Sequence, residues 1–115
     1  MEKFTQLKVW QKAHKLVIFV YQLTKKYPDE EKYNLVSQMR RAAISVAANI
    51  VEGTKRKTIK DRKNFHVIAD TSLEELKYYF ILSKDLKIIN QELKEKGIKS
   101  CQEVGRMLFS LTKKL

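Results

Sequence analysis

The chain is poor in cysteine, the residue through which many small proteins cross-link their cores. Only one of its 115 residues is a cysteine, Cys101, which excludes an intrachain disulfide and a cysteine-cluster zinc site. We interpret Cys101 as a small core residue rather than a reactive thiol. A chain of this length buries roughly two-thirds of the surface that its unfolded form exposes. Residues 1–115 therefore suffice for a single domain without cross-links.

Long apolar stretches are also missing. The longest run, LVIFVY at residues 16–21, falls well short of the roughly twenty residues that a bilayer span requires. The N-terminus lacks the successive charged, apolar and small-residue segments of a signal peptide. These absences predict a soluble cytoplasmic protein without a membrane partner.

Proline occurs once and glycine three times, so the chain has few natural breaks. No segment alternates apolar and polar residues over a strand's length, and no Asn-Gly or Asp-Gly hairpin signal occurs. Apolar residues instead recur at spacings of three and four, which indicates four amphipathic helices joined by short loops. The predicted fold is all-α, an antiparallel up-down-up-down four-helix bundle. Its four apolar faces are Val9, Ala13, Leu16, Val20, Leu23 and Tyr27; Val36, Met39, Ala43, Val46, Ile50 and Gly53; Phe65, Ala69, Ser72, Leu76, Tyr79 and Leu86; and Leu93, Gly97, Cys101, Val104, Leu108 and Leu111.

Several residues predict where the helices begin and end. Pro28 should end the first helix, and the Pro-Asp-Glu-Glu turn that it begins can form a helical turn of its own. Gly53 suits the left-handed position just beyond the second helix. Thr58 and Asp61 resemble a capping box for the third helix, and Asn90 can cap the fourth.

Small residues are more frequent in the second and fourth helices than a monomeric bundle requires. They are Ala42, Ala43, Ala47 and Ala48, and then Gly97, Cys101 and Gly105. They permit close packing either within one bundle or between subunits, and aromatic residues outside the main faces favour an oligomer. Those aromatic residues are Trp10, Phe19, Tyr78 and Phe109. Gly97 also permits a break in the fourth helix, although a continuous helix is favoured.

Positive charge is concentrated in one short segment. The formal net charge is +11, and six of the nine residues from 55 to 63 are basic. We call this set the basic turn: Lys55, Arg56, Lys57, Lys60, Arg62 and Lys63. Neutralising phosphates releases counterions, so the cluster favours binding of RNA or DNA. A lysine-rich composition would equally produce an ordinary solvated segment.

Arg40 and Arg41 lie about four turns before the basic turn on the second helix. They either extend the basic surface along the bundle's flank or pair with Asp70 and Glu74. No aromatic residues interleave with the basic ones between residues 55 and 63, so the sequence does not predict selective reading of bases there.

No catalytic, cofactor or metal constellation is evident. The three glycines are far apart and form no phosphate-binding loop. His14 and His66 fall on different helices, each without a second histidine or cysteine one turn away, so we expect a surface residue and a boundary residue. Glu74 and Glu75 point about 100° apart and do not converge; we expect a solvated pair, partly paired with Lys77 or with arginines of the second helix. The prediction is a protein that is not an enzyme and needs no cofactor or metal.

Two polar residues near the basic turn have expected structural roles. Glu52 lies one turn before Arg56 and can offset part of the local positive charge. Asn49 lies beside the apolar face, where a buried amide needs hydrogen-bond partners, so we expect it to fix the register of its helix.

Four segments together resemble a known family. They are FTQLKVWQKAHKLVIFVYQLTKKYP at residues 4–28, YNLVSQMRRAAISVAANIVEG at 33–53, SLEELKYYFILSKDL at 72–86 and EVGRML at 103–108. They are similar to the four-helix bundle proteins encoded in intervening sequences of bacterial 23S rRNA genes. The motifs VWQKAH, SQMRRAA and NIVEG make the resemblance specific, and it covers nearly the whole chain.

The resemblance implies a homopentamer with a central channel. It also implies similarity to the accessory variability protein of diversity-generating retroelements, a basic pentamer that binds nucleic acid and a reverse transcriptase. The signature positions are Arg40, Arg41, Asn49, Glu52 and Gly53. Many members have proline where this chain has Ala47, so the second helix should be less kinked here.

The leading hypothesis is therefore a homo-oligomeric bundle that binds RNA or DNA through phosphate contacts. The alternative is a protein-interaction scaffold or an accessory subunit for a nucleic-acid enzyme such as a reverse transcriptase.

Overall fold

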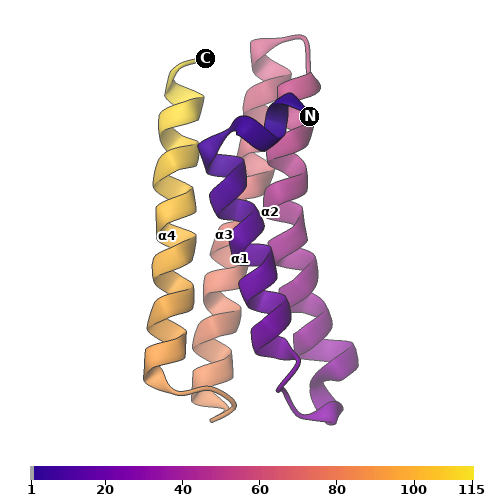
Figure 1. Ribbon diagram of the computed structural model, residues 1–115, viewed down its shortest axis with the longest axis vertical. Coiled ribbons are helices and arrows are strands. Elements are labelled where there is room, and N and C mark those ends of the chain that lie inside the picture. The colour runs from indigo at the N-terminus through magenta and orange to yellow at the C-terminus, as the bar shows by residue number, and fades with distance from the viewer. Residues whose placement is uncertain (1) are drawn as a thin grey trace.

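The computed structural model describes residues 2–115, and this part of the chain contains four α-helices and no strand. They are α1 (Lys8–Thr24), α2 (Ser37–Lys55), α3 (Ile59–Asp85) and α4 (Gln91–Lys113). Consecutive helices run in opposite directions along a body of 43 × 24 × 22 Å (Figure 1). The predicted all-α four-helix bundle is thus confirmed.

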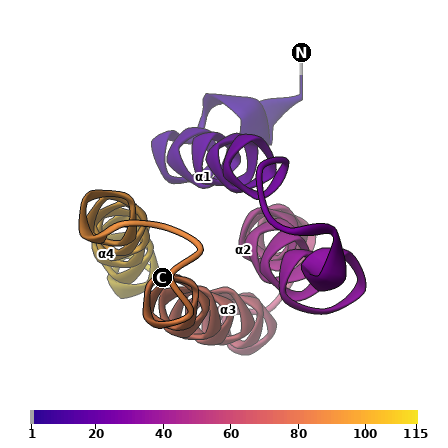
Figure 2. The same ribbon diagram turned by 90° about the horizontal axis from the view of Figure 1, so that it is seen from below.

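The helices follow one another around the bundle in chain order. Seen along the bundle, α1 lies beside α2 and α4, while α3 closes the ring between them (Figure 2). Each predicted apolar position of the first two helical segments, from Val9 to Tyr27 and from Val36 to Gly53, is buried. The fourth face is also confirmed, with Leu93 and Leu111 half-buried at its two ends.

The predicted face of α3 was partly wrong. Phe65 and Tyr79 are only half-buried and Leu86 is 51% exposed, whereas Phe80 is fully buried. The buried positions recur at alternating spacings of three and four, and they are His66, Ala69, Leu73, Leu76, Phe80 and Ser83, with Ser72 beside them. Apolar residues that remain exposed on the opposite side of α3, such as Val67, Ile68 and Ile81, obscured this pattern in the sequence.

The connections agree with most of the predicted helix ends. After Pro28 the chain forms a 3-10 turn, Asp29–Glu31, and then a π-helical turn, Lys32–Val36, which the sequence did not predict. Thr58 Oγ1 accepts a hydrogen bond from the Asp61 amide at 3.1 Å, and Asn90 Oδ1 accepts one from Leu93 at 2.9 Å. Helix α4 is continuous through Gly97, and α2 is continuous through Ala47.

Gly53 does not occupy a left-handed position, contrary to the sequence-based expectation. It lies inside α2, which continues to Lys55, and none of the glycines in residues 2–115 has a positive φ. A Cβ atom at Gly53 would lie 3.2 Å from the imidazole of His66. The position therefore serves the close approach of α3 to α2 rather than helix termination.

Gly97 has a similar role in the contact between α4 and α3. A Cβ atom there would lie 2.6 Å from the ring of Phe80, which is fully buried. For Gly97, the structure therefore supports close packing within one bundle. Gly105 differs, because a Cβ atom there would be 3.8 Å from the Leu73 side chain, an ordinary contact.

Replacing these two glycines should have opposite effects on stability. Gly97→Ala should destabilise the fold by up to about 2 kcal/mol, because overpacking costs about 1–3 kcal/mol and the helical gain offsets only about 1 kcal/mol of it. Gly105→Ala should be neutral or stabilising, since only the helical gain applies. Urea unfolding measures both free energies, and changes of the same sign in the two variants would contradict this packing.

Candidate nucleic-acid interface

The alternation of helix direction places three separate segments at one end of the bundle. The N-terminal segment, the connection between α2 and α3, and the C-terminus all lie at the top of Figure 1. We call this the basic end. It holds the whole basic turn together with Lys3, Lys8, Lys113 and Lys114. These four lysines were not among the predicted site residues, although the predicted topology places them at this end.

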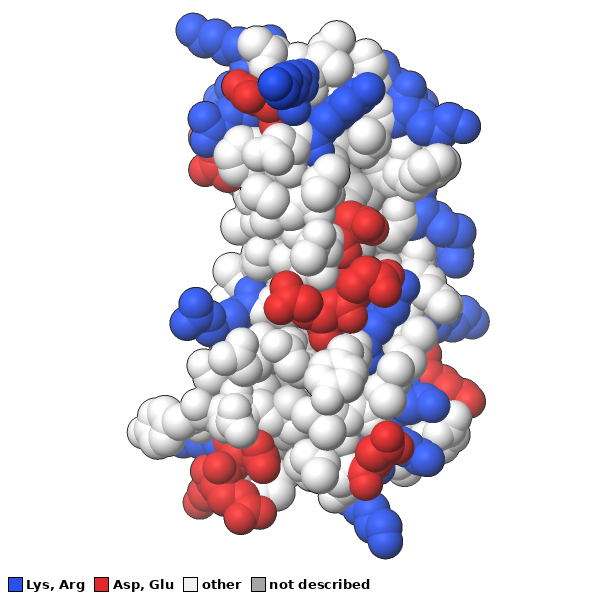
Figure 3. All heavy atoms as spheres, turned by 180° about the vertical axis from the view of Figure 1, so that it is seen from behind, with Lys and Arg blue, Asp and Glu red and all other residues white. Residues whose placement is uncertain are grey.

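Both ends carry charges of both signs, but lysine and arginine predominate at the basic end (Figure 3). At the lower end, acidic residues from 29 to 31 lie between Lys26 and Lys32 in sequence. Exposed Asp70, Glu74 and Glu75 lie along the middle of α3, between the two ends.

Arginines of the basic turn hold the turn itself together. The guanidinium of Arg56 pairs with the carboxylate of Glu52 at 2.9 Å, as predicted, and its Cζ lies 4.5 Å from the ring centroid of Phe65. Arg62 donates from Nε to the carbonyl oxygen of Arg56 at 2.7 Å. These contacts fix the path of the chain from α2 into α3.

The lysines of the basic turn point to solvent instead. Lys55, Lys57, Lys60 and Lys63 are all exposed. Within residues 2–115, none of the four forms an ion pair with a carboxylate. The four ammonium groups therefore remain available for an external anion.

Arg40 and Arg41 are not part of this cluster. They lie in the first turn of α2, roughly 20 Å from the basic turn along the helix. Arg40 donates from Nε to Thr24 Oγ1 at 3.0 Å and lies over the ring of Tyr21, so it links α2 to α1 rather than pairing with Asp70 or Glu74. Arg41 is exposed.

The signature residue Asn49 joins α2 to α3 through a serine pair. Its Nδ2 donates to the carbonyl oxygen of Ser45 at 2.8 Å and to Ser45 Oγ at 3.1 Å. Ser45 Oγ also accepts a hydrogen bond from Ser72 Oγ on α3 at 2.8 Å. Among the described residues the Asn49 amide forms no hydrogen bond to α3 itself, so its hydrogen-bonded link to that helix runs through Ser45.

His66 connects three helices beneath the basic end, and it is buried rather than a boundary residue. Its Nδ1 lies 2.7 Å from Thr112 Oγ1 of α4, and the ring packs against Gly53 of α2. The Thr112 hydroxyl also donates to the Leu108 carbonyl at 2.8 Å, and the Nε2 side of the ring faces Gly53. Burial lowers the pKa of His66 from its usual value. The other histidine, His14, is exposed, as predicted.

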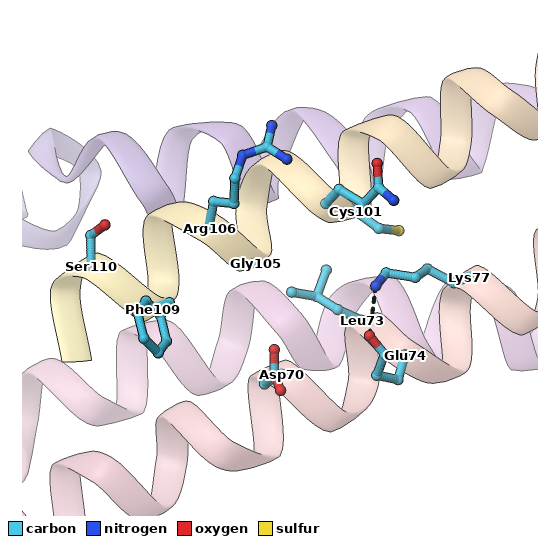
Figure 4. Close-up of a pocket in the computed structure, with 10 residues that line it drawn as sticks. Asp70, Leu73, Glu74, Lys77, Cys101, Gly105, Arg106, Phe109 and Ser110 are labelled. Atoms are coloured by element: carbon cyan, nitrogen blue, oxygen red, sulfur yellow. Dashed lines mark hydrogen bonds and ion pairs between the residues drawn. The ribbon is translucent and has the colours of Figure 1, made fainter. Parts of the chain in front are cut away.

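A second feature is an open groove between α3 and α4. It encloses about 670 Å³, and Asp70, Leu73 and Phe109 are among the residues that line it (Figure 4). Lys77 pairs with Glu74 at 2.6 Å on the α3 side, as predicted. Two of the neighbouring apolar side chains are largely exposed, Phe109 at 65% and Val67 at 61%.

Comparison with known families shows to which family the chain is related. The model of the family described as 23S rRNA-intervening sequence protein matches residues 5–110. The chain belongs to this family. The bundle is also similar to the crystal structure of a protein of unknown function from the S23 ribosomal protein family of Bacteroides thetaiotaomicron. The TM-score is 0.84 at 25% identity, covering 91% of this chain and 98% of the other. No curated protein matches the sequence.

Other chemistry in this family member is limited. Cys101 is buried, as predicted for a core residue, and burial raises the pKa of its thiol to about 12. Across residues 2–115, no three histidine, cysteine, aspartate or glutamate side chains are placed to hold a metal ion. Nor does any helix in that range combine the length and apolar character of a membrane span.

The stability of the fold should fall as the pH is lowered below neutrality. The unfolded chain binds a proton at His66 near its usual pKa of about 6.5, whereas the folded chain binds it only at lower pH. Urea unfolding between pH 7.5 and 5.5 should therefore show a decrease in the free energy of unfolding. This decrease is complete only at a pH below the pKa of His66 in the folded chain. His66→Asn, which retains an amide near Thr112, should flatten this dependence.

Glu103, whose pKa is also shifted, should not contribute to the pH dependence measured in that experiment. A hydrogen bond and the positive charge of Lys12 lower the pKa of Glu103, so its contribution is lost only at more acidic pH. An unchanged pH dependence between 7.5 and 5.5 in His66→Asn would show that His66 is not its source.

Proposed function

We propose that this protein binds RNA or DNA through phosphate contacts at the basic end, as a non-enzymatic homo-oligomer in the cytoplasm. One observation carries the proposal: the exposed lysines of the basic turn have no partner carboxylate among the described residues. Bringing cations together costs electrostatic repulsion, which a bound polyanion removes. Each phosphate neutralised would also release counterions.

The roles of the two cation types support this assignment. Arg56 is held by Glu52 and Phe65, and Arg62 by the Arg56 carbonyl, so both shape the turn. The lysines carry flexible charges that follow a phosphate backbone without a fixed geometry. In addition, α3 begins within the turn at Ile59, and the amide dipoles at a helix N-terminus attract anions.

Reversing the lysine charges should abolish binding. In a variant with Lys55, Lys57, Lys60 and Lys63 changed to Glu, affinity for structured RNA and for duplex DNA should fall at least a hundredfold at low salt. The dependence of log affinity on log salt should become shallower by about one unit for each lost phosphate contact. Gel-shift titrations across a salt series measure both quantities. Arg56 is left unchanged, because its loss would also disturb the turn.

The matched control changes Lys25, Lys26, Lys32 and Lys99 to Glu. These exposed lysines lie outside the basic end, and the change in net charge is identical. Binding should weaken only modestly in this control. Equal losses in the two variants would show that binding follows total charge rather than the basic end, and salt-independent binding would contradict phosphate contacts.

The groove between α3 and α4 favours a second function, that of a protein-interaction scaffold. Exposed Phe109 and Val67 beside an open groove resemble a surface that is covered in an assembly. We propose that another copy of the chain covers it in a homopentamer. In the same proposal, the assembled scaffold acts as an accessory subunit for a nucleic-acid enzyme such as a reverse transcriptase.

Introducing charge into the groove tests the scaffold function. The double variant Val67→Glu and Phe109→Glu should reduce the particle mass by light scattering to that of one 13.6 kDa chain, because desolvating two carboxylates is costly. Tyr33→Glu is the control, since Tyr33 is 87% exposed and does not line the groove. A multimeric mass in the double variant would show that the groove is not a contact between subunits.

A further inference from the structure

A second hollow lies at the basic end, between the N-terminal segment and the end of α2. In Figure 1 this segment passes in front of the upper part of α2. The hollow encloses about 440 Å³ and is lined by Glu2, Lys3, Phe4, Leu7, Thr54 and Lys55. Lys55 belongs to the basic turn, so the hollow and the proposed phosphate-binding surface are continuous.

Several contacts hold the N-terminal segment in place. Residues Lys3–Gln6 form a 3-10 turn, and Gln11 Nε2 donates to the Thr5 carbonyl at 2.9 Å. The ring of Phe4 meets Trp10 edge-on, with 5.3 Å between centroids, and Trp10 stacks on His14 at 5.0 Å. Phe4 is therefore anchored to α1 while it lines the hollow.

The chemistry of the lining fits a flat, polar-edged ring. Phe4 and Leu7 provide apolar surface, and aromatic side chains are the usual stacking partners of unpaired bases. Thr54 Oγ1 donates its proton to the Val51 carbonyl at 2.7 Å, which leaves its lone pairs to accept a hydrogen bond. The Glu2 carboxylate also accepts hydrogen bonds from ring N–H and amino groups, but it repels phosphate.

We infer that this hollow takes an unpaired nucleobase of a single-stranded nucleic acid, while the basic turn contacts the adjoining phosphates. The inference rests on the proposed function and specifies its ligand as single-stranded. A duplex keeps its bases stacked and paired, so it contacts the lysines without filling the hollow. Lys3 and Lys55 lie at the hollow and bind the phosphates that flank the inserted base.

The test compares single strands and duplexes on the full chain. Ten-nucleotide single-stranded RNA and DNA oligomers and a blunt ten-base-pair duplex are titrated into wild type and Phe4→Leu. Loss of stacking should reduce the affinity for both single strands about tenfold and the affinity for the duplex less than twofold. Phe4→Tyr, which keeps the ring, should bind single strands within twofold of wild type. The fluorescence of Trp10, the only tryptophan, should change with the single strands.

Tyr33→Leu is the matched control, because Tyr33 is an exposed aromatic residue that lines neither this hollow nor the groove between α3 and α4. Its affinities should equal those of wild type. The inference is overturned if Phe4→Leu leaves single-strand affinity unchanged, if it lowers single-strand and duplex affinity alike, or if Phe4→Tyr loses as much as Phe4→Leu. In each of those cases phosphate binding by the basic turn still stands. If wild type binds none of the oligomers, the proposed function is overturned as well.

Discussion

The reversal of the chain between consecutive helices, tightest between α2 and α3, is the constraint on which the rest of this structure depends. Only Arg56, Lys57 and Thr58 separate α2 from α3, so α3 must return along the helix before it. The same reversal occurs after α1 and after α3 (Figure 1). As a result, the two chain termini and the α2–α3 connection meet at one end, and lysines that are distant in sequence become neighbours.

Packing beneath that end keeps the charged segments in position. The imidazole of His66 fits against Gly53 and bonds Thr112, so it joins α2, α3 and α4 just below the turn. Arg56 and Arg62 add contacts within the turn itself. The exposed lysines of the basic turn form no ion pair among the described residues, and this division between held arginines and unpaired lysines is the physical basis of the proposal that the surface binds a polyanion.

Much of the architecture could be predicted from local patterns. The faces of α1 and α2, the caps at Thr58 and Asn90 and the continuity of α4 depend on interactions within a few residues, which the sequence displays directly. The face of α3 was misplaced because this helix also carries apolar residues on its exposed side. Gly53 was misassigned because a glycine that ends a helix and one that admits a neighbouring ring look the same in sequence.

The sequence by itself determined four amphipathic helices, their approximate ends and a dense group of cations between the second and third, because spacing and charge are local properties. Only the tertiary structure decided which of those cations are free. It separated Arg40 from the cluster, tied Arg56 to Glu52 and Phe65, and placed Phe4 beside Lys55. Such relations depend on the distances between segments far apart in the chain, which follow from how the helices pack rather than from any one segment.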